Sequence, residues 1–429
     1  MSEVRQNLIS LERVMQCSNQ DGGQSRWRPF LLALMFLSLS SAVFAQTSIF
    51  SIQNSPSPNV FGNTLNAVVA LSASDAWAVG FQNSSNLNES RTLTLHWDGV
   101  SWRTIPSPNP GKCNQGNFGN VLTSVAAVSS NDVWAVGFTF PCNALLQPMT
   151  MHWDGTKWSV VATPKLPFNN NALNGVFALA SDNVYAVGFQ TASNGASLTL
   201  VEHWDGTSWT VMSSPNKNQT GNVLQSISGT SPSDIWAVGD AVAPNVPVRT
   251  LVEHFDGTQW KLVNSPNPLP TGSLNQNVLV SVTAVSPTDA TAVGFILDSS
   301  FLRELTMVQH WDGVSWKVVS SPNVDSNSGS FNTLKSVSAF SSSNIYAIGF
   351  FANGNTVAQQ RTLVEHFDGT SWSIVSSPTK GLAQQLNGVF ALPGTTNVWS
   401  VGAWAQNGTD PETGLLIVPK SLVLFSPIG

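Results

Sequence analysis

One short element recurs seven times and constrains the fold more than any other feature of the sequence. A Trp or Tyr followed by Ala-Val-Gly stands at four sites, and altered forms stand at three more, at intervals of 51 to 57 residues. The seven copies are Trp77–Gly80, Trp134–Gly137, Tyr185–Gly188, Trp236–Gly239, Thr291–Gly294, Tyr346–Gly349 and Trp399–Gly402. Self-similarity at such a period is typical of repeat architectures. The chain is therefore expected to be seven copies of one unit.

Each copy of this element follows an apolar run and a short polar turn. In the first copy the run is Leu65–Leu71, and Asp75 stands two residues before the Trp. An Asp or Asn occupies that position in all seven copies. Because these side chains satisfy the backbone of tight turns, the pattern predicts a buried strand, a turn and a second strand.

A second element, His-Trp/Phe-Asp-Gly or a close variant, follows in six of the copies. It begins at His96, His152, His203, His254, His310 and His366. A Trp stands four residues after each Asp, and a Pro six residues after that Trp. Asp-Gly between two β-rich runs predicts a hairpin, and Pro is tolerated at the end of an outermost strand. Four antiparallel strands repeated seven times predict an all-β, seven-bladed β-propeller.

The two ends of the chain complement each other. The seventh copy has strands at Leu386–Leu392, Val398–Gly402 and Ser421–Phe425, but it lacks the hairpin and the fourth strand. Near the other end, Phe50 stands six residues before Pro56, which is the Trp-to-Pro spacing of the other copies. We therefore expect the N-terminal strand to complete the C-terminal blade.

The N-terminal segment has the pattern of an export signal. Arg26 and Arg28 precede an apolar run, Phe30–Ala45, that ends in small residues. Its order of basic, apolar and small residues is that of a secretory signal, and it is short for a membrane span. We expect residues 1–45 to be a signal peptide and residues 46–429 to form one propeller domain. The mature protein is then secreted, extracellular or in the cell envelope, without membrane insertion.

Composition agrees with export. Charged residues are 10% of the chain, against about 25% in an average soluble domain. The formal net charge is −6, and no basic run is present, so nucleic acid is not an expected partner. We expect a monomer. Cys113 and Cys142 are the two cysteines after the leader, and export favours a disulfide between them.

The order of these elements resembles the kelch, galactose-oxidase-like class of propeller. The shared features are an apolar strand that ends in Gly, a third strand that ends in Asp, a Trp, and a strand that runs to Pro. The resemblance covers residues 48–425, with the departure that Gly80 is followed by Phe81 rather than by a second Gly. Both tyrosines, Tyr185 and Tyr346, fill the aromatic position of the repeat. The tyrosine copper ligands of galactose oxidase and the tyrosine nucleophile of sialidase-type chemistry are therefore not expected.

The repeat also accounts for most residues that could carry chemistry. All six histidines occupy one position on six blades, so they cannot converge on a metal; we expect each to bond to a neighbouring hairpin. No metal, cofactor or catalytic residue is predicted. The carboxylates that the repeat does not require are Glu89, Asp240, Asp298, Glu304, Asp325, Asp410 and Glu412. A glycosidase needs two carboxylates close together. A glycan-active hydrolase or lyase that uses loop carboxylates therefore stays as the alternative function.

Loop lengths point to one face of the propeller. The connections between second and third strands and the links between blades vary in length, and both emerge on one face, here called the variable face. Diversified loops on a rigid scaffold are where binding usually occurs, although neutral drift in solvent-exposed loops would give the same variation. We expect a non-catalytic binding or scaffold protein that recognises an extracellular glycan or an envelope protein. The candidate binding residues are Trp404, Asp240, Asp298, Arg303, Glu304, Asp410 and Glu412. For Trp404, packing back onto the seventh blade is the alternative.

Overall fold

The computed structural model describes residues 49–83, 89–111, 118–141, 145–168, 170–243, 246–269, 275–353, 360–408 and 416–427. These residues form strands and loops, and none of them lies in a helix that could cross a membrane. The predicted signal peptide, the predicted Cys113–Cys142 disulfide, Asp410 and Glu412 lie outside these residues.

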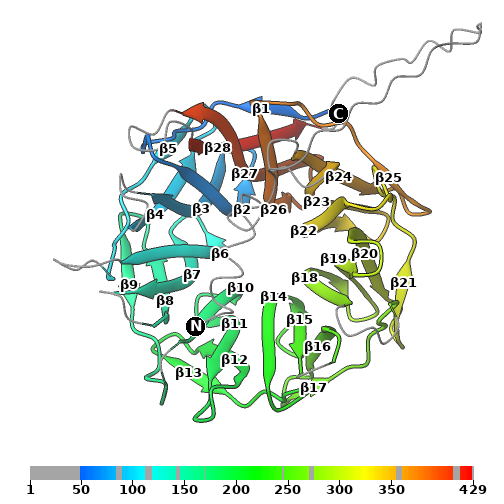
Figure 1. Cartoon of the computed structure of the whole chain (residues 1–429). Coiled ribbons are helices and arrows are strands. Elements are labelled where there is room, and N and C mark those ends of the chain that lie inside the picture. The colour runs from blue at the N-terminus through cyan, green and yellow to red at the C-terminus, as the bar shows by residue number, and fades with distance from the viewer. Residues whose placement is uncertain are drawn as a thin grey trace, which may run out of the picture.

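Seven four-stranded units are arranged around a central axis, each beginning with an innermost strand and continuing outward (Figure 1). The first strands are β2 (Asn63–Ser72), β6 (Gly119–Ser129), β10 (Ala172–Ala180), β14 (Gly221–Ser231), β18 (Gln276–Ser286), β22 (Ser330–Ser341) and β26 (Ala383–Ala391). The second strands are β3 (Asp75–Asn83), β7 (Asp132–Phe140), β11 (Asn183–Thr191), β15 (Asp234–Val242), β19 (Asp289–Asp298), β23 (Asn344–Asn353) and β27 (Asn397–Gly408).

The outer half of each unit is a hairpin. The third strands are β4 (Ser90–Trp97), β8 (Gln147–Trp153), β12 (Ser197–Trp204), β16 (Arg249–Phe255), β20 (Arg303–Trp311), β24 (Arg361–Phe367) and β28 (Leu416–Pro427). The outermost strands are β5 (Trp102–Thr104), β9 (Trp158–Val161), β13 (Trp209–Met212), β17 (Trp260–Leu262), β21 (Trp316–Val319), β25 (Trp372–Ile374) and β1 (Ser51–Gln53). Blades 1 to 7 are numbered here in the order of their first strands.

The hairpins between third and outermost strands form as the Asp-Gly pairs predict. Gly99 has a φ of 89°, and its five counterparts have φ values from 89° to 94°, a region that favours glycine. Beside it, Asp98 accepts hydrogen bonds through Oδ1 from the backbone N–H groups of Val100 and Ser101. The Asp side chain therefore closes the turn that the Gly makes possible.

The N-terminal strand completes the last blade, as the spacing between Phe50 and Pro56 predicts. Strand β1 pairs antiparallel with β28, with Ser51 opposite Phe425. Phe50 is only 3% exposed, and its ring packs edge-on against Tyr346 of blade 6, with 6.2 Å between the ring centres. The chain ends therefore share one sheet, ordered β1-β28-β27-β26.

Blades 1 and 7 pack against each other. The ring of Trp102 in blade 1 lies edge-on to Trp399 in blade 7, with 5.3 Å between ring centres. Asn387 of β26 donates a hydrogen bond of 2.9 Å to the carbonyl oxygen of Leu65 in β2. These contacts join the two ends of the blade series, which lie side by side in Figure 1.

Single parallel bridges merge some blades into larger sheets. Ser197 pairs with Gly221, and Glu304 pairs with Phe331, so blades 3 and 4 share one eight-stranded sheet and blades 5 and 6 another. Each bridge joins the beginning of a third strand to the beginning of the next blade's first strand. The variable-length loops and links therefore meet on one face, as predicted.

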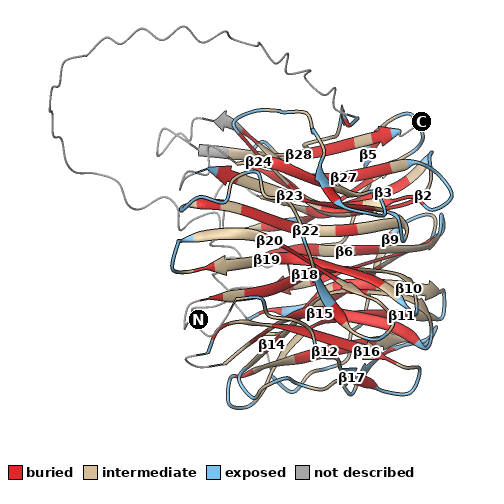
Figure 2. Cartoon of the chain, turned by 90° about the vertical axis from the view of Figure 1, so that its right-hand side faces the viewer, coloured by how far each residue is buried: buried red, intermediate tan, exposed pale blue. Residues whose placement is uncertain are grey.

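Large aromatic side chains pack against one another between blades. Buried residues follow the strands, while exposed ones collect at the loops (Figure 2). In the first blade, His96 stacks on Trp77, with 4.4 Å between ring centres, and its Nε2 lies 2.9 Å from Oδ1 of Asp75. The other five histidines bond in the same way to the Asp or Asn that opens their second strand. The neighbouring hairpin to which each histidine bonds is thus the one between first and second strands.

Candidate functional site at the channel mouth

The innermost strands share an irregularity that shapes the centre of the molecule. In β2 the pairing with β3 shifts between Leu65 and Ala67, so Asn66 is an extra, bulged residue. The same shift follows the corresponding Leu in all seven first strands. Opposite it stands the Gly of the recurring element. A Cβ on Gly80 would lie 2.0 Å from the carbonyl oxygen of Thr64, so only glycine permits this close approach.

The seven bulged residues surround the mouth of a central channel of about 360 Å³, and together they are called the bulge ring. They are Asn66, Thr123, Asn174, Gln225, Val280, Lys335 and Asn387. Each is the first residue of its strand that lines the channel, and these strands begin at the variable face, so the ring lies at the end of the channel nearer that face. Six of the seven are polar, and Val280 is the exception.

Four members of the ring tie neighbouring blades together. Each donates a hydrogen bond to the carbonyl oxygen of the Leu that precedes the next bulge. The pairs are Asn66 to Leu122 at 2.7 Å, Thr123 to Leu173 at 2.9 Å, Asn174 to Leu224 at 2.8 Å and Asn387 to Leu65 at 2.9 Å. These bonds hold the mouth rigid over blades 7, 1, 2 and 3, and over the neighbouring edge of blade 4.

The ring differs over blades 4 to 6, where none of the three bulged side chains has such a bond within the described residues. Gln225 turns instead to Asp240, and its Nε2 donates to Oδ1 at 3.2 Å. Asp240 occupies the position that Phe81 has in the first copy. Burial raises the pKa of Asp240 to about 6, against the opposing effect of the Gln225 hydrogen bond. Among the described residues, Asp240 is thus a partly buried carboxyl that accepts a hydrogen bond from one side-chain amide.

Lys335 is the most unusual member of the ring. Its Nζ lies 5.8 Å from the centre of the Phe350 ring, and within the described residues it makes neither a hydrogen bond nor an ion pair within 4 Å. Burial lowers the pKa of Lys335, and the negative charge of Glu304 opposes that shift. Burial in turn raises the pKa of Glu304 to about 7, against the attraction of Lys335. Both side chains are partly exposed.

Two other predicted site residues are engaged with each other in the loop of blade 5. Arg303 Nη2 lies 3.3 Å from Oδ2 of Asp298, and its Nη1 donates to the carbonyl oxygen of Ser326 at 2.8 Å. The guanidinium also lies over the ring of Phe301, 4.7 Å from its centre. This network fixes the conformation of the loop.

The fifth candidate residue that can be placed, Trp404, lies on blade 7. Its side chain is partly buried and packs against the cluster that contains Phe50. The ammonium of Lys380 lies over its ring, 4.7 Å from the centre. Ala403, rather than Trp404, takes the position of Phe81 after the Gly. The structure thus brings Asp240 close to Gln225 and Glu304 close to Lys335, both in the bulge ring. Trp404 instead contacts Lys380 and the core of blade 7.

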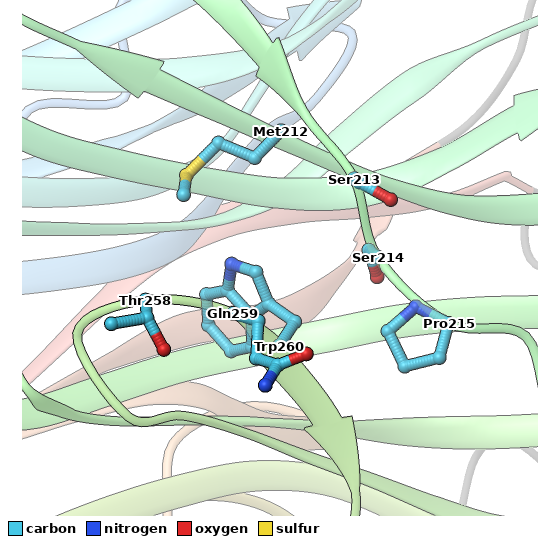
Figure 3. Close-up of a pocket in the computed structure, with 7 residues that line it drawn as sticks. All are labelled: Met212, Ser213, Ser214, Pro215, Thr258, Gln259 and Trp260. Atoms are coloured by element: carbon cyan, nitrogen blue, oxygen red, sulfur yellow. The ribbon is translucent and has the colours of Figure 1, made fainter.

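A second hollow of about 310 Å³ lies between blades 3 and 4, at their outer strands (Figure 3). Its lining residues are Met212, Ser213, Ser214, Pro215, Thr258, Gln259 and Trp260. Ser214 donates a hydrogen bond of 2.6 Å to Oε2 of the buried Glu253. The same contact joins Ser321 to Glu365 at 2.7 Å, so it belongs to the packing of neighbouring blades rather than to a unique serine site.

Exposed apolar side chains are distributed unevenly over the surface. Sixteen large ones are exposed among the described residues, and half of them lie in loops and links of the variable face. These eight are Val60, Leu145, Phe168, Val246, Phe301, Leu302, Val324 and Leu382. The opposite face has two at its hairpin tips, Val100 and Val314, and the others lie on or beside the outermost strands.

The bulge ring is a feature that sequence reasoning missed. A signal was present, because a polar residue follows the Leu of the first strand in six of the seven copies. A second missed signal is Asn two residues before that Leu, again in six copies. Asn222, for example, accepts from the backbone N–H of Lys217 at 2.9 Å and donates to the carbonyl oxygen of Ser197 at 3.3 Å. These asparagines anchor the links between blades next to the channel mouth.

Comparison with known proteins supports the fold. No protein-family model matches the chain, and no curated protein matches it. One similar solved structure is "YCF48 bound to D1 peptide", with a TM-score of 0.53, 12% identity, and coverage of 91% of this chain and 100% of that one. The chain has a β-propeller fold. A puromycin hydrolase (S511A mutant complexed with PGG) is also similar, with a TM-score of 0.51, 10% identity, and coverage of 83% of this chain and 54% of that one.

At such identities the likeness to these propellers shows the fold alone. Within the described residues, no three His, Cys, Asp or Glu side chains are grouped as metal ligands would be.

Proposed function

We propose that the chain is an exported, non-catalytic binding scaffold: a seven-bladed, kelch-like propeller, closed by its two ends, that recognises a segment of another protein. The binding surface is the variable face around the bulge ring. The observation that carries this proposal is that eight of the sixteen exposed large apolar side chains lie in the loops and links of that face, whereas the hairpin tips of the opposite face have two. Diversified loops on a rigid scaffold are where binding usually occurs.

The loop of blade 5 supports the proposal most directly. Leu302 is 69% exposed and Phe301 is 54% exposed. Leu302 also has a φ of +49°, a left-handed conformation that is uncommon for a non-glycine residue. Ser328 Oγ and the backbone N–H of Gly329 hold this conformation by donating to the carbonyl oxygens of Phe301 and Leu302. Non-glycine residues held in such a backbone conformation are found preferentially at functional sites.

A protein ligand fits this surface better than a glycan does. Sugars are bound on flat, open aromatic faces, whereas the exposed side chains here are mainly aliphatic, and Lys380 lies over the ring of Trp404. The similar YCF48 structure was solved with a D1 peptide bound, which is consistent with a propeller of this kind holding a peptide.

Panning of a random peptide library on the mature protein tests the proposal. We expect the selected peptides to lose about tenfold or more in affinity with Leu302→Ser, as for an interface anchor, and to bind Val314→Ser normally. Val314 is 83% exposed on the opposite face, so it is the matched control. Glycan-array binding without peptide selection, or hydrolysis of a polysaccharide panel, would contradict the proposal in favour of a glycan binder or a glycan-active enzyme.

A further inference from the structure

The bulge ring places one positively charged side chain, that of Lys335, at the mouth of the channel. Among the residues that line the channel, all of them described, Lys335 is the single charged side chain. The other polar members of the ring are amides and one hydroxyl. An inference about this cation rests on the proposed function, because it concerns the chemistry of a segment bound at the same mouth.

Lys335 occupies the position at which other copies of the repeat have a side chain that donates a hydrogen bond to the next blade. At the same position, Asn66, Asn174 and Asn387 donate to the next blade's Leu carbonyl. The Lys335 ammonium makes no such bond, and its aliphatic stem brings it to the face of Phe350 instead. A partly buried ammonium is costly unless a negative group or hydrogen-bond acceptors complete its surroundings.

We propose that Lys335 binds a carboxylate of the partner segment, either an acidic side chain or a free C-terminus, at the channel mouth. Asn amides carry two donor hydrogens. Those of Asn66, Asn174 and Asn387 use one on the neighbouring blade. The second donates to no other group within the described residues, so an incoming oxygen atom can accept it. The ring therefore combines one charge with several neutral donors, which suits an anion of carboxylate size.

Glu304 makes this site sensitive to pH. Glu304, on β20, is the carboxyl whose negative charge opposes the lowering of the Lys335 pKa. Lys335, on β22, is the positive group that opposes the raising of the Glu304 pKa. The neighbour of Glu304, Arg303, is already paired with Asp298. The pKa of Glu304 is about 7, so the residue loses its charge as pH falls from 8 to 6. Asp240, with a pKa of about 6, changes in the same direction. A bound carboxylate should then be repelled less, and binding should strengthen over that range.

Capped pentapeptide pools, one with a fixed central Asp and one with a fixed central Asn, test the proposal, together with a pool that has a free C-terminal carboxylate. We expect the protein to prefer the Asp pool or the free-terminus pool by about tenfold over the Asn pool, as for a charged hydrogen bond. Which of the two is preferred identifies the source of the carboxylate. The Lys335→Asn variant should lose the preference, and it should fold normally, because Asn is the repeat's own residue there.

A second variant keeps the test independent of Lys335. Glu304→Gln should bind the preferred pool more tightly at pH 8 and should remove most of the pH dependence between 8 and 6. Selection of acidic pools that persists in Lys335→Asn would overturn the inference, as would Lys335-dependent binding of polyglucuronate in place of peptides. If peptides bind in a Leu302-dependent manner without preferring a carboxylate, the inference fails and the proposed function stands. If no pool binds at all, both fail.

Discussion

Phe50→Ala is expected to lower the free energy of unfolding by about 3–5 kcal/mol, the usual cost of removing a buried aromatic ring. Phe50 fills the position that Trp has in the other blades, and it packs against Tyr346 across the interface between blades 6 and 7. It also precedes the strand that pairs with β28. Urea unfolding followed by tryptophan fluorescence measures the change.

Ile49→Ala is the matched control for Phe50→Ala. Ile49 is adjacent in sequence and 43% exposed, so its replacement should change stability by less than about 1 kcal/mol. Deleting residues 46–59 should have a larger effect than Phe50→Ala and should promote aggregation, because it opens the edge of β28. A deletion variant that stays monomeric with unchanged unfolding would show that the N-terminal strand does not hold the ring together.

Replacing three buried carboxyls by amides is expected to stabilise the protein in a pH-dependent way. Glu202, Glu253 and Glu365 are fully buried on the third strands of blades 3, 4 and 6. Burial raises the pKa of each to about 8, from an ordinary value of 4.5. Each is therefore protonated in the folded protein at neutral pH, and it ionises on unfolding.

The sign of the effect follows from this difference in proton binding. Between pH 4.5 and pH 8 the folded state holds more protons than the unfolded state, so stability falls as pH rises through that window. Each buried carboxyl can lower the free energy of unfolding by up to about 4 kcal/mol at pH 8, at about 1.4 kcal/mol for each unit of pKa shift. Glu253→Gln and Glu365→Gln should therefore unfold at higher urea concentration than wild type at pH 8, with little difference at pH 4.

Gln309 provides the control for these variants within the same chain. It occupies the corresponding position in blade 5, is fully buried, and donates from Nε2 to the carbonyl oxygen of Pro266 at 2.9 Å. Gln309→Glu should lower stability at pH 8 and should do so much less at pH 4. If the Glu→Gln variants show the same stability change at both pH values, their carboxyls do not remain protonated in the folded protein.

Features that depend on the repeat could be predicted from the sequence. Asp98 and Gly99 define by local chemistry a hairpin that recurs in six copies, and the seven copies of the element that ends in Gly80 in the first copy specify the second strands. The pairing of β1 with β28 was predictable because Phe50 and Pro56 keep the spacing of the repeat. Each of these inferences needs only the chain's own periodicity and the physics of a tight turn.

The candidate site was less predictable, because it depends on how strands pair and bend. Asn66 and Lys335 become ring members only through a bulge, and that bulge follows from the close approach at Gly80 and its counterparts. Asp240 and Glu304 were found by their departure from the repeat, and they lie beside the ring. Trp404 was found by the same rule, but its neighbours are Lys380 and the core of blade 7. A departure from the repeat thus identifies unusual residues without showing which of them share a site.

Photo-crosslinking tests the central claim, that a protein segment binds on the variable face around the bulge ring, most directly. A selected peptide that carries a photoreactive residue would be irradiated with the protein, and mass spectrometry would identify the crosslinked positions. We predict crosslinks to the blade 5 loop around Leu302, to the link near Val324 and to the ring near Lys335. Crosslinks confined to the hairpin tips around Val100 and Val314 would contradict the account.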